Sequence, residues 1–324
     1  MRLLVTGGAG FIGSCFIRYI LNKYNNYKVI NLDVLTYCGN LENLRDVEKN
    51  PNYQFVKGNI CDKTLVRDLI SQVDCVINFA AESHVDNSIN NPLIFEQTNV
   101  QGTLNLLQAS KEIGIERYIQ ISTDEVYGTL GETGYFSETS SIMPNSPYSA
   151  SKASGDMFVR AFFETYNLPT LITRCSNNYG PYQYPEKLIP FFISKLLKNE
   201  KIPLYGDGLN VRDWLYVYDH CSAIDKVLHN GRFGEVYNIG GHNEKTNIEI
   251  TKIILKKMNK DESYIEYIPD RLGHDRRYAI SNNKIKNELG WEPSVTFDKG
   301  IELTIDWYLN NQIWINNINE RHFA

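Results

Sequence analysis

The chain has 324 residues and a formal net charge of −5, with 42% hydrophobic and 22% charged residues. This length is typical of one large α/β unit or of two domains, and the composition is that of an ordinary globular protein. The net negative charge argues against a nucleic-acid-binding protein, because such a protein needs a basic face to neutralise phosphates.

The sequence also lacks the patterns of metal-binding, redox and membrane proteins. Its six cysteines form no CxxC pair and have no histidine at ligand spacing, so we expect no metal site. No apolar run approaches membrane-spanning length, and the chain opens on the strand-like run 2–6 instead of a signal-peptide pattern. We therefore expect a cytoplasmic protein without membrane or nucleic-acid partners.

The first half of the chain alternates strand-like and helical patterns. Short apolar runs cover residues 3–6, 28–33, 53–58, 74–80, 117–123 and 170–175. Amphipathic stretches at 11–24, 65–71 and 93–113 lie between them. Continuous apolar strands joined by helices predict a parallel sheet covered on both faces, which is a doubly wound Rossmann fold.

The second half is less regular. Helical patterns cover 188–198, 248–258 and 299–309, with the strand-like EVYNIG before the second of them. We expect a first domain over residues 1–180, with returning segments near 210–240. Residues 181–324 are expected to form mainly a smaller, discontinuous α/β part that binds the substrate.

A glycine pattern joins the first strand to the first helix. Gly7, Gly10 and Gly13 form GxxGxxG, in which they permit a tight turn, close approach to a pyrophosphate and close helix–strand packing. The pattern alone is weak, since any tight turn can need glycine. Asp33 strengthens it, because a carboxylate at the end of the second strand accepts hydrogen bonds from the adenosine ribose and repels a 2′-phosphate. The sequence therefore predicts NAD rather than NADP.

Two later strand ends are suited to the same ligand. Asn59 and Ile60 follow the third strand, where an adenine edge would lie, and Ala80, Ala81 and Ser83 follow the fourth. Ligands of open α/β sheets bind at the carboxyl ends of the strands, so we expect one shared site, with Phe11 and Ile12 beside the glycines.

Tyr148 and Lys152 form a YxxxK motif at the start of a helical stretch. The spacing of four places both side chains on one helix face. The ordinary pKa of tyrosine, about 10, is too high for a base at neutral pH. We expect the Lys152 ammonium and a cationic nicotinamide ring to lower it.

Thr123, Asp124 and Glu125 follow the fifth strand. A threonine here would bond the hydroxyl being oxidised and share its proton with Tyr148. The adjacent carboxylates could be a solvated turn, but their place beside YxxxK favours a catalytic pair.

Taken together, these motifs resemble those of the extended short-chain dehydrogenase/reductase family. GGAGFIGS, Asp33, AAESH, STDEVYG, YSASK and RCSNNYGPYQYPEKLIP are most similar to its nucleotide-sugar dehydratases, and the likeness continues through LYGDGLNVRDWLYVYDH and DRLGHDRRYAI. It covers nearly the whole chain. The Asp–Glu pair separates these dehydratases from related 4-epimerases.

The resemblance implies a three-step reaction on dTDP-glucose within dTDP-rhamnose biosynthesis. Tyr148, with Lys152 and Thr123, takes the C4 hydroxyl proton as hydride passes to NAD. Glu125 then removes the C5 proton while Asp124 protonates the departing C6 hydroxyl. Hydride returns to C6, which gives dTDP-4-keto-6-deoxy-glucose and water. The choice of dTDP over UDP, GDP or CDP rests on resemblance alone.

The resemblance also implies further contacts and a homodimer formed through helices 93–113 and 147–168. For NAD, the additional contacts are Leu35, Thr36, Thr98 and Asn178. For the nucleotide sugar, they are Ser83, Thr123, Asn177, Lys187, Leu188, Pro203, Tyr205, Arg212, Asn247, Asp270, Arg271 and His274. Arg276 and Arg277 are further candidates for phosphate binding, or else ordinary surface arginines. The chain departs from the family pattern at Asn59, where Asp is common, and at Leu272, where Pro is common.

Three alternatives stay open. A 4-epimerase or decarboxylase would use the same Tyr–Lys oxidation, but epimerisation needs no acid to expel the C6 hydroxyl. A non-catalytic NAD-sensing regulator would not need Thr123, Tyr148 and Lys152 together. A scaffold whose glycine loop is only a turn would not need Asp33.

Overall fold

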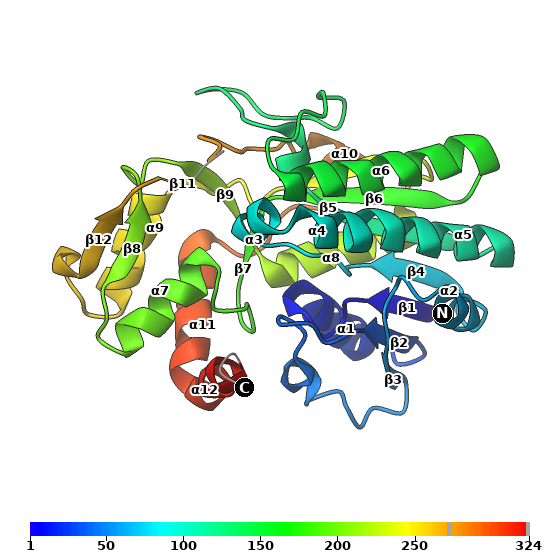
Figure 1. The fold of residues 1–324 in the computed structure, drawn as a ribbon, viewed down its shortest axis with the longest axis horizontal. Coiled ribbons are helices and arrows are strands. Elements are labelled where there is room, and N and C mark those ends of the chain that lie inside the picture. Colours follow the sequence, from blue (N-terminus) through cyan, green and yellow to red (C-terminus); the bar gives the residue numbers. More distant parts are fainter. Residues whose placement is uncertain (271–273, 322–324) are drawn as a thin grey trace.

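The computed structural model describes residues 1–270 and 274–321, and within them seven parallel strands form the central sheet in the order β10-β6-β5-β4-β1-β2-β3 (Figure 1). The strands are β1 (Arg2–Thr6), β2 (Lys28–Asp33), β3 (Tyr53–Lys57), β4 (Cys75–Asn78), β5 (Arg117–Thr123), β6 (Thr170–Cys175) and β10 (Val236–Ile239). The six strands predicted from apolar runs are confirmed, and so is the doubly wound Rossmann sheet.

Alternate side chains of each strand enter two separate cores. Leu3 and Val5 pack with α1 (Phe11–Lys23) and α8 (Val217–Asn230) on one face. Leu4 packs with the helices of the other face, since successive side chains of a strand point to opposite sides. Those helices are α2 (Lys63–Ile70), α5 (Thr103–Ile113) and α6 (Pro147–Tyr166).

The strand order reverses between β1 and β4. From β1 the chain continues to β2 and β3 on one side, whereas β4, β5 and β6 follow on the other. At such a switch point the loops after neighbouring strands diverge and leave a crevice at their carboxyl ends, where ligands of these folds bind.

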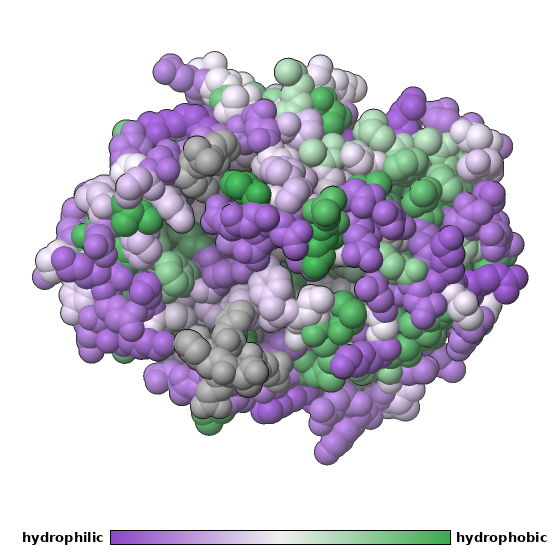
Figure 2. All heavy atoms as spheres, viewed as in Figure 1, coloured by the Kyte–Doolittle hydropathy of each residue, from purple (hydrophilic) through white to green (hydrophobic). Residues whose placement is uncertain are grey.

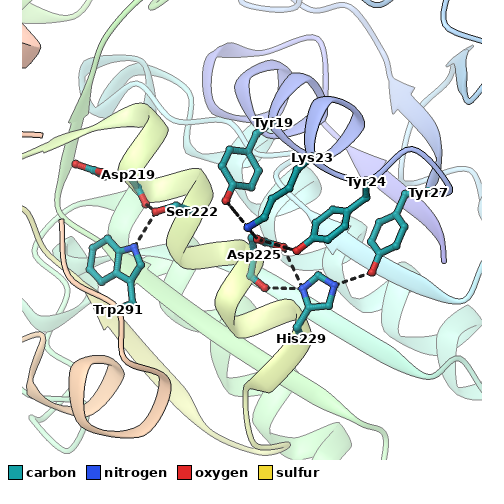
Figure 3. A network of polar contacts seen from close by, with 9 residues as sticks. All are labelled: Tyr19, Lys23, Tyr24, Tyr27, Asp219, Ser222, Asp225, His229 and Trp291. Carbon is teal, nitrogen blue, oxygen red and sulfur yellow. Dashed lines mark hydrogen bonds and ion pairs between the residues drawn. The ribbon is translucent and has the colours of Figure 1, made fainter. Parts of the chain in front are cut away.

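A polar network joins α1 to α8 (Figure 3). Nζ of Lys23 lies 2.6 Å from Oδ2 of Asp225, and Nδ1 of His229 lies 3.0 Å from Oδ1 of the same carboxylate. The hydroxyl of Tyr27 lies 2.7 Å from Nε2 of His229. The helix that begins at the glycine loop is thereby anchored at its far end.

The helix expected over 93–113 is interrupted, which corrects the prediction of one continuous helix. It consists of α4 (Pro92–Phe95), a π-helical segment, η2 (Glu96–Gly102), and α5. The wider π turn carries Asn99, whose amide bonds both the backbone N–H and the carbonyl of Glu82, at 2.9 and 3.0 Å. Interruptions of this kind are frequent at functional sites.

Most of the remaining elements form a second part, grouped on the left of Figure 1 around its own core. Its helices are α7 (Leu188–Leu197), α9 (Asn247–Lys257), α11 (Phe297–Asn310) and α12 (Gln312–Arg321). Its strands are β7 (Asn177–Tyr179), β8 (Ile202–Tyr205), β9 (Val211–Tyr216), β11 (Glu244–Thr246) and β12 (Ile265–Ile268). The short elements elsewhere are η1 (Leu41–Leu44), α3 (Val85–Asn90), η3 (Asp124–Tyr127), η4 (Glu262–Tyr264) and α10 (Asn283–Leu289).

No helix within the described parts of the chain is both long and apolar enough to cross a membrane.

Candidate active site

A cavity of about 400 Å³ opens at the carboxyl ends of the central strands. Two glycines of the first loop are required by its geometry. A Cβ on Gly7, which has φ +68°, would lie 2.6 Å from the backbone nitrogen of Ala80, and a Cβ on Gly13 would lie 2.4 Å from the carbonyl oxygen of Gly7. Any larger residue would push the loops around the cavity apart.

The N-terminus of α1 faces this cavity. Its N-cap is Gly10, which has no side chain to bond the first-turn N–H groups, and Phe11, Ile12 and Gly13 line the cavity wall. These N–H groups and the positive end of the helix dipole form an anion site of the kind that holds a pyrophosphate.

Asp33 ends β2 at the cavity edge. Its two carboxylate oxygens accept hydrogen bonds from the N–H groups of Ala9 and Leu35, at 2.9 and 2.8 Å. Burial raises the pKa of Asp33, and the two backbone N–H groups oppose that rise. The carboxylate is therefore held in one orientation, with lone pairs still available for ribose hydroxyls.

The residues predicted to contact NAD lie together, with one exception. Leu35 does not line the cavity, and it contributes through its N–H group while its backbone has a left-handed φ of 58°. The others all line it: Gly7, Gly10, Phe11, Ile12, Gly13, Asp33, Thr36, Asn59, Ile60, Ala80, Ala81, Ser83, Thr98, Tyr148, Lys152 and Asn178.

Tyr148 and Lys152 are both buried in the cavity wall. Burial raises the pKa of the Tyr148 phenol well above its usual value, and the Glu125 carboxylate adds to this. Nζ of Lys152 donates to the carbonyl of Ile121 at 2.7 Å, and burial lowers the pKa of its ammonium. The expected lowering of the Tyr148 pKa by Lys152 is not found: burial raises this pKa, and a hydrogen bond from the Thr123 hydroxyl opposes the rise.

Asp124 is almost fully buried, at 2% exposure. Burial, followed by the neighbouring carboxylates of Glu125 and Asp213, raises the pKa of Asp124 well above its usual value. Its Oδ1 lies 3.3 Å from Oγ1 of Thr123, while Oδ2 has no hydrogen-bond partner among the described residues. These surroundings favour the protonated form of the side chain, whose buried Oδ2 is unpartnered within the described residues.

Glu125 lines the cavity next to Asp124. Its backbone N–H donates to Oγ1 of Thr123 at 3.2 Å, which is the N-cap bond of η3. The cap turns the chain sharply after β5, and it brings the hydroxyl and both carboxyl groups to the same wall.

His220 contacts a cavity residue, and the sequence motifs did not predict it as part of the site. Its Nδ1 lies 2.9 Å from Oδ1 of Asn178, and burial lowers the pKa of His220 to about 3. The imidazole is therefore neutral and donates from Nδ1. The Asn178 amide, which also donates to the carbonyl of Ser176 at 3.0 Å, is fixed in orientation.

Several further residues of the cavity wall were not predicted: Ile94, Gln97, Gln183, Tyr184 and Glu186. The cluster of proline, glycine and aromatic residues in YGPYQYP could have indicated Gln183 and Tyr184. Ile94 and Gln97 precede Thr98 in a stretch that the sequence reads as ordinary helix.

The residues predicted to bind the nucleotide sugar fall into two groups. Ser83, Thr123, Asn177 and Lys187 line the cavity, and Nζ of Lys187 donates to the carbonyl of Ser83 at 3.1 Å. The residues that do not line this cavity are Leu188, Pro203, Tyr205, Arg212, Asn247, Asp270 and His274. Arg271 and Leu272 lie outside the described residues.

The outer group is partly held together by polar contacts. Nδ1 of His274 lies 2.6 Å from Oδ1 of Asp270, and the rings of His274 and Tyr205 pack edge to face. Arg212 is buried, and Nη2 of its guanidinium donates to the carbonyl of Asp275 at 2.9 Å. Its charge also counteracts the rise in the pKa of Asp124, so it links this group to the catalytic end.

The two further arginines have structural partners. Arg277 binds Glu244, with Nε 2.7 Å from Oε2, and donates to the carbonyls of Gly131 and Gly134. Arg276 pairs with Asp207 in an exposed ion pair at 2.9 Å.

Comparison with known proteins gives consistent matches over the whole chain. The family model described as GDP-mannose 4,6 dehydratase matches residues 4–304. A dTDP-glucose 4,6-dehydratase of Xanthomonas campestris pv. campestris is 54% identical over 97% of this chain and 95% of its own.

Solved structures agree. The structure of dTDP-glucose 4,6-dehydratase from Bacillus anthracis, in complex with NAD, is 54% identical to this chain in sequence, with a TM-score of 0.93. The match covers 98% of this chain and 99% of the other. The structure of the dTDP-glucose 4,6-dehydratase from Streptomyces venezuelae, also with NAD bound, is 50% identical to this chain in sequence, with a TM-score of 0.95. This match covers 97% of this chain and 98% of the other. The chain therefore belongs to the nucleotide-sugar 4,6-dehydratases of the extended short-chain dehydrogenase/reductase family.

Proposed function

We propose that this protein is an NAD-dependent dTDP-glucose 4,6-dehydratase, a hydro-lyase that forms dTDP-4-keto-6-deoxy-glucose and water. The observation that carries the proposal is the position of the buried Asp124, whose pKa is raised, beside Glu125, Thr123 and Tyr148 in the wall of one cavity. Oxidation of a hydroxyl needs only the tyrosine, threonine and lysine. Loss of water needs an acid and a base at the same time.

The residues of the cavity fit NAD. The uncapped N-terminus of α1 suits the pyrophosphate, and the fixed carboxylate of Asp33 suits the adenosine ribose. We assign NAD binding to the other cavity residues that the sequence predicts to contact NAD. When bound, NAD accepts hydride from the sugar C4, returns it to C6, and its cationic ring favours the phenolate of Tyr148.

In the first step Tyr148 accepts the proton of the C4 hydroxyl. Its phenol is desolvated, so proton transfer depends on neighbouring groups that stabilise the phenolate. Thr123 supplies one such group, because a hydrogen bond from its hydroxyl lowers the pKa of Tyr148. Lys152, anchored on the carbonyl of Ile121, has further N–H donors for the phenol and the ribose.

In the second step Glu125 removes the C5 proton, which the C4 ketone has made acidic. Asp124 donates its proton to the C6 hydroxyl, which leaves as water. The raised pKa of Asp124 favours the protonated form that a general acid requires, and its Oδ2 has no hydrogen-bond partner within the described residues. Glu125 then returns a proton to C5, and the proton that Tyr148 took from the C4 hydroxyl replaces the one that Asp124 lost, so the enzyme ends in its starting state.

The test is to incubate the purified protein with dTDP-glucose and follow the product by mass spectrometry and by its absorbance in alkali. We expect the loss of one water per sugar with no net change in NADH. A sugar of unchanged mass that has become its C4 epimer would overturn the dehydratase assignment. Tight binding of a different nucleotide sugar without conversion of dTDP-glucose would do the same.

For the nucleotide, we propose that the phosphates and base extend from Ser83, Asn177 and Lys187 to the outer group of Arg212, Tyr205 and His274. On this basis residues 1–180, with returning segments near 210–240, form the NAD-binding domain, and 181–324 bind mainly the nucleotide sugar. We also infer a cytoplasmic enzyme, an inference supported by all six cysteines being free thiols.

We further propose a homodimer formed through α4, η2, α5 and α6. Large apolar side chains are exposed on this face at Leu93, Met157 and Phe158. Figure 2 shows apolar surface among polar side chains over the region where Figure 1 draws these helices. Exposed apolar side chains that gather in this way are typical of a subunit interface.

A further inference from the structure

The C-terminal helix α12 packs against the NAD side of the molecule. It follows the region matched by the family model, which ends at residue 304. In Figure 1 it lies beside the segment that contains η1, near the start of the chain, and its Trp314, Ile315 and Ile318 bury their side chains in the core of the second part. Tyr37 and Cys38, from the loop after β2, pack against the same core.

A buried hydrogen bond joins α12 to η1. Nε1 of Trp314 donates to Oδ1 of Asn43 at 2.9 Å. The two residues are only 6% and 2% exposed, so water cannot readily replace either partner. Since the indole N–H is a donor only and Asn43 is fully enclosed, the bond fixes which way the asparagine amide faces.

The other end of the same amide holds the glycine loop. Nδ2 of Asn43 donates to the carbonyl of Ala9 at 3.0 Å, and the backbone N–H of Asn40 donates to that carbonyl at 3.0 Å. The N–H of Ala9 in turn donates to Asp33. An unbroken chain of hydrogen bonds therefore runs from Trp314 through Asn43 and Ala9 to the carboxylate at the ribose position.

The position of the Ala9 carbonyl matters for an anionic ligand. Ala9 is fully buried between the glycines that line the cavity, and its own carbonyl is bonded on the η1 side. A carbonyl turned toward a pyrophosphate would repel it, whereas N–H groups attract it. The side chain of Asn43 and the backbone N–H of Asn40, the N-cap of η1, thus keep the glycine loop in the orientation that presents N–H groups to the cavity.

Other contacts hold α12 in place. Nδ2 of Asn317 donates to the carboxylate of Glu42 at 3.0 and 3.1 Å. The guanidinium of Arg18 on α1 donates to the carbonyl of Asn43 and lies 4.3 Å from the ring centroid of Tyr182, which packs edge to face on Trp314. Helices α1 and α12 and segment η1 are therefore joined around Asn43.

We propose that α12 is a strap that positions the pyrophosphate loop for NAD, with Trp314 and Asn43 as positioning residues. This inference rests on the NAD dependence proposed above. It concerns retention of the cofactor and not the chemistry on the sugar. It predicts that the strap controls how fast NAD leaves, while turnover at saturating NAD is unchanged.

The test compares Trp314→Phe with Trp307→Phe. The ring of Trp307 packs against the ring of Trp314, with centroids 5.1 Å apart. No hydrogen bond joins Trp307 to Asn43 in the described part of the chain. Each protein is loaded with radiolabelled NAD, desalted and chased with unlabelled NAD, with no sugar present. We expect Trp314→Phe to release NAD about 3- to 10-fold faster than the unaltered protein, the effect of one lost hydrogen bond. Trp307→Phe should release it at the unaltered rate.

Asn43→Ala provides a second route to the same answer. Because both residues act through one chain of hydrogen bonds, Asn43→Ala combined with Trp314→Phe should release NAD no faster than Asn43→Ala alone. Label lost during desalting by Trp314→Phe alone counts as the same positive result. Unchanged release from Trp314→Phe, equal acceleration in Trp307→Phe, or additive effects in the double variant would overturn the proposal. Absence of turnover on dTDP-glucose, by contrast, bears only on the proposed function.

Discussion

Asp124 and Glu125 are adjacent in sequence, yet the structure gives them different surroundings. Asp124 is enclosed, with the carboxylate of Asp213 among its neighbours, whereas Glu125 lies at the cavity wall at the start of η3. The sequence predicts that two carboxylates stand beside the catalytic tyrosine. The assignment of Asp124 as the acid rests on resemblance alone, because its pKa depends on burial and on the charges of Asp213 and Arg212, which lie almost ninety positions further along the chain.

Replacing Glu125 with Gln should separate oxidation from elimination. The variant retains Tyr148, Lys152 and Thr123 but lacks the base for the C5 proton, so we expect turnover to fall by about 10²- to 10⁴-fold. NADH should accumulate after dTDP-glucose is added, which is measured by its absorbance. The exposed Glu132→Gln serves as the matched control and should turn over normally. If Glu125→Gln forms no NADH at all, the assignment of Glu125 to the second step is wrong.

Asp124→Asn should stabilise the protein at higher pH while it abolishes dehydration. Burial raises the folded-state pKa of Asp124 above that of the unfolded chain, so the native state keeps a proton that the unfolded chain loses. The unaltered protein therefore loses stability as pH rises from about 4, the unfolded value, through the raised folded pKa. Urea unfolding of the two proteins at about pH 4 and about pH 8 measures this, with a gain for Asp124→Asn expected only at the higher pH. An equal difference at both pH values would contradict it.

The secondary-structure elements predicted best are those whose own residues carry the pattern that determines them. The inner parallel strands are apolar runs buried on both faces, whereas the edge strand β3 is partly exposed, and the positions of the six predicted strands are confirmed to within a few residues. The π-helical segment η2 is different, because its residues are compatible with ordinary helix and the contacts that hold Asn99, with Glu82 and Ser151, come from distant parts of the chain. Helix α12 has no predictable role for a similar reason. Its partner, η1, lies at the other end of the sequence.

The contact between α1 and α8 should depend on pH. The Asp225 carboxylate raises the pKa of His229, and His229 and Lys23 together lower the pKa of Asp225. The His229 contribution is present below about pH 6.5, the unfolded value, and is lost as pH rises through the raised folded pKa. Asp225 contributes above about pH 4 and loses its effect in more acidic solution.

We therefore expect His229→Gln to cost about 0.5–1 kcal/mol near pH 5.5 and less near pH 8. Urea unfolding at the two pH values checks this. A His229→Gln loss that is the same at both pH values would mean that the imidazole acts by packing alone.

At the scale of the whole molecule, the proposed homodimer depends on the face formed by α4, η2, α5 and α6. Leu93 on α4 and Ile313 on α12 are both 75% exposed, which makes them a matched pair. A charge at Leu93 would be buried without a partner in the proposed dimer, so Leu93→Asp should shift the protein toward monomer in analytical ultracentrifugation. Ile313→Asp should leave the mass unchanged. Dissociation by both variants, or by neither, would place the interface elsewhere or exclude it.

The bond between Trp314 and Asn43 joins residues 271 positions apart. During synthesis on the ribosome, the indole that orients Asn43 emerges long after the glycine loop and β2. A nascent chain can form its central sheet before that point, yet its nucleotide loop lacks one of its two proposed supports. On the proposal above, firm retention of the cofactor waits for the synthesis of α12, so a product that stops before α12 should retain NAD poorly.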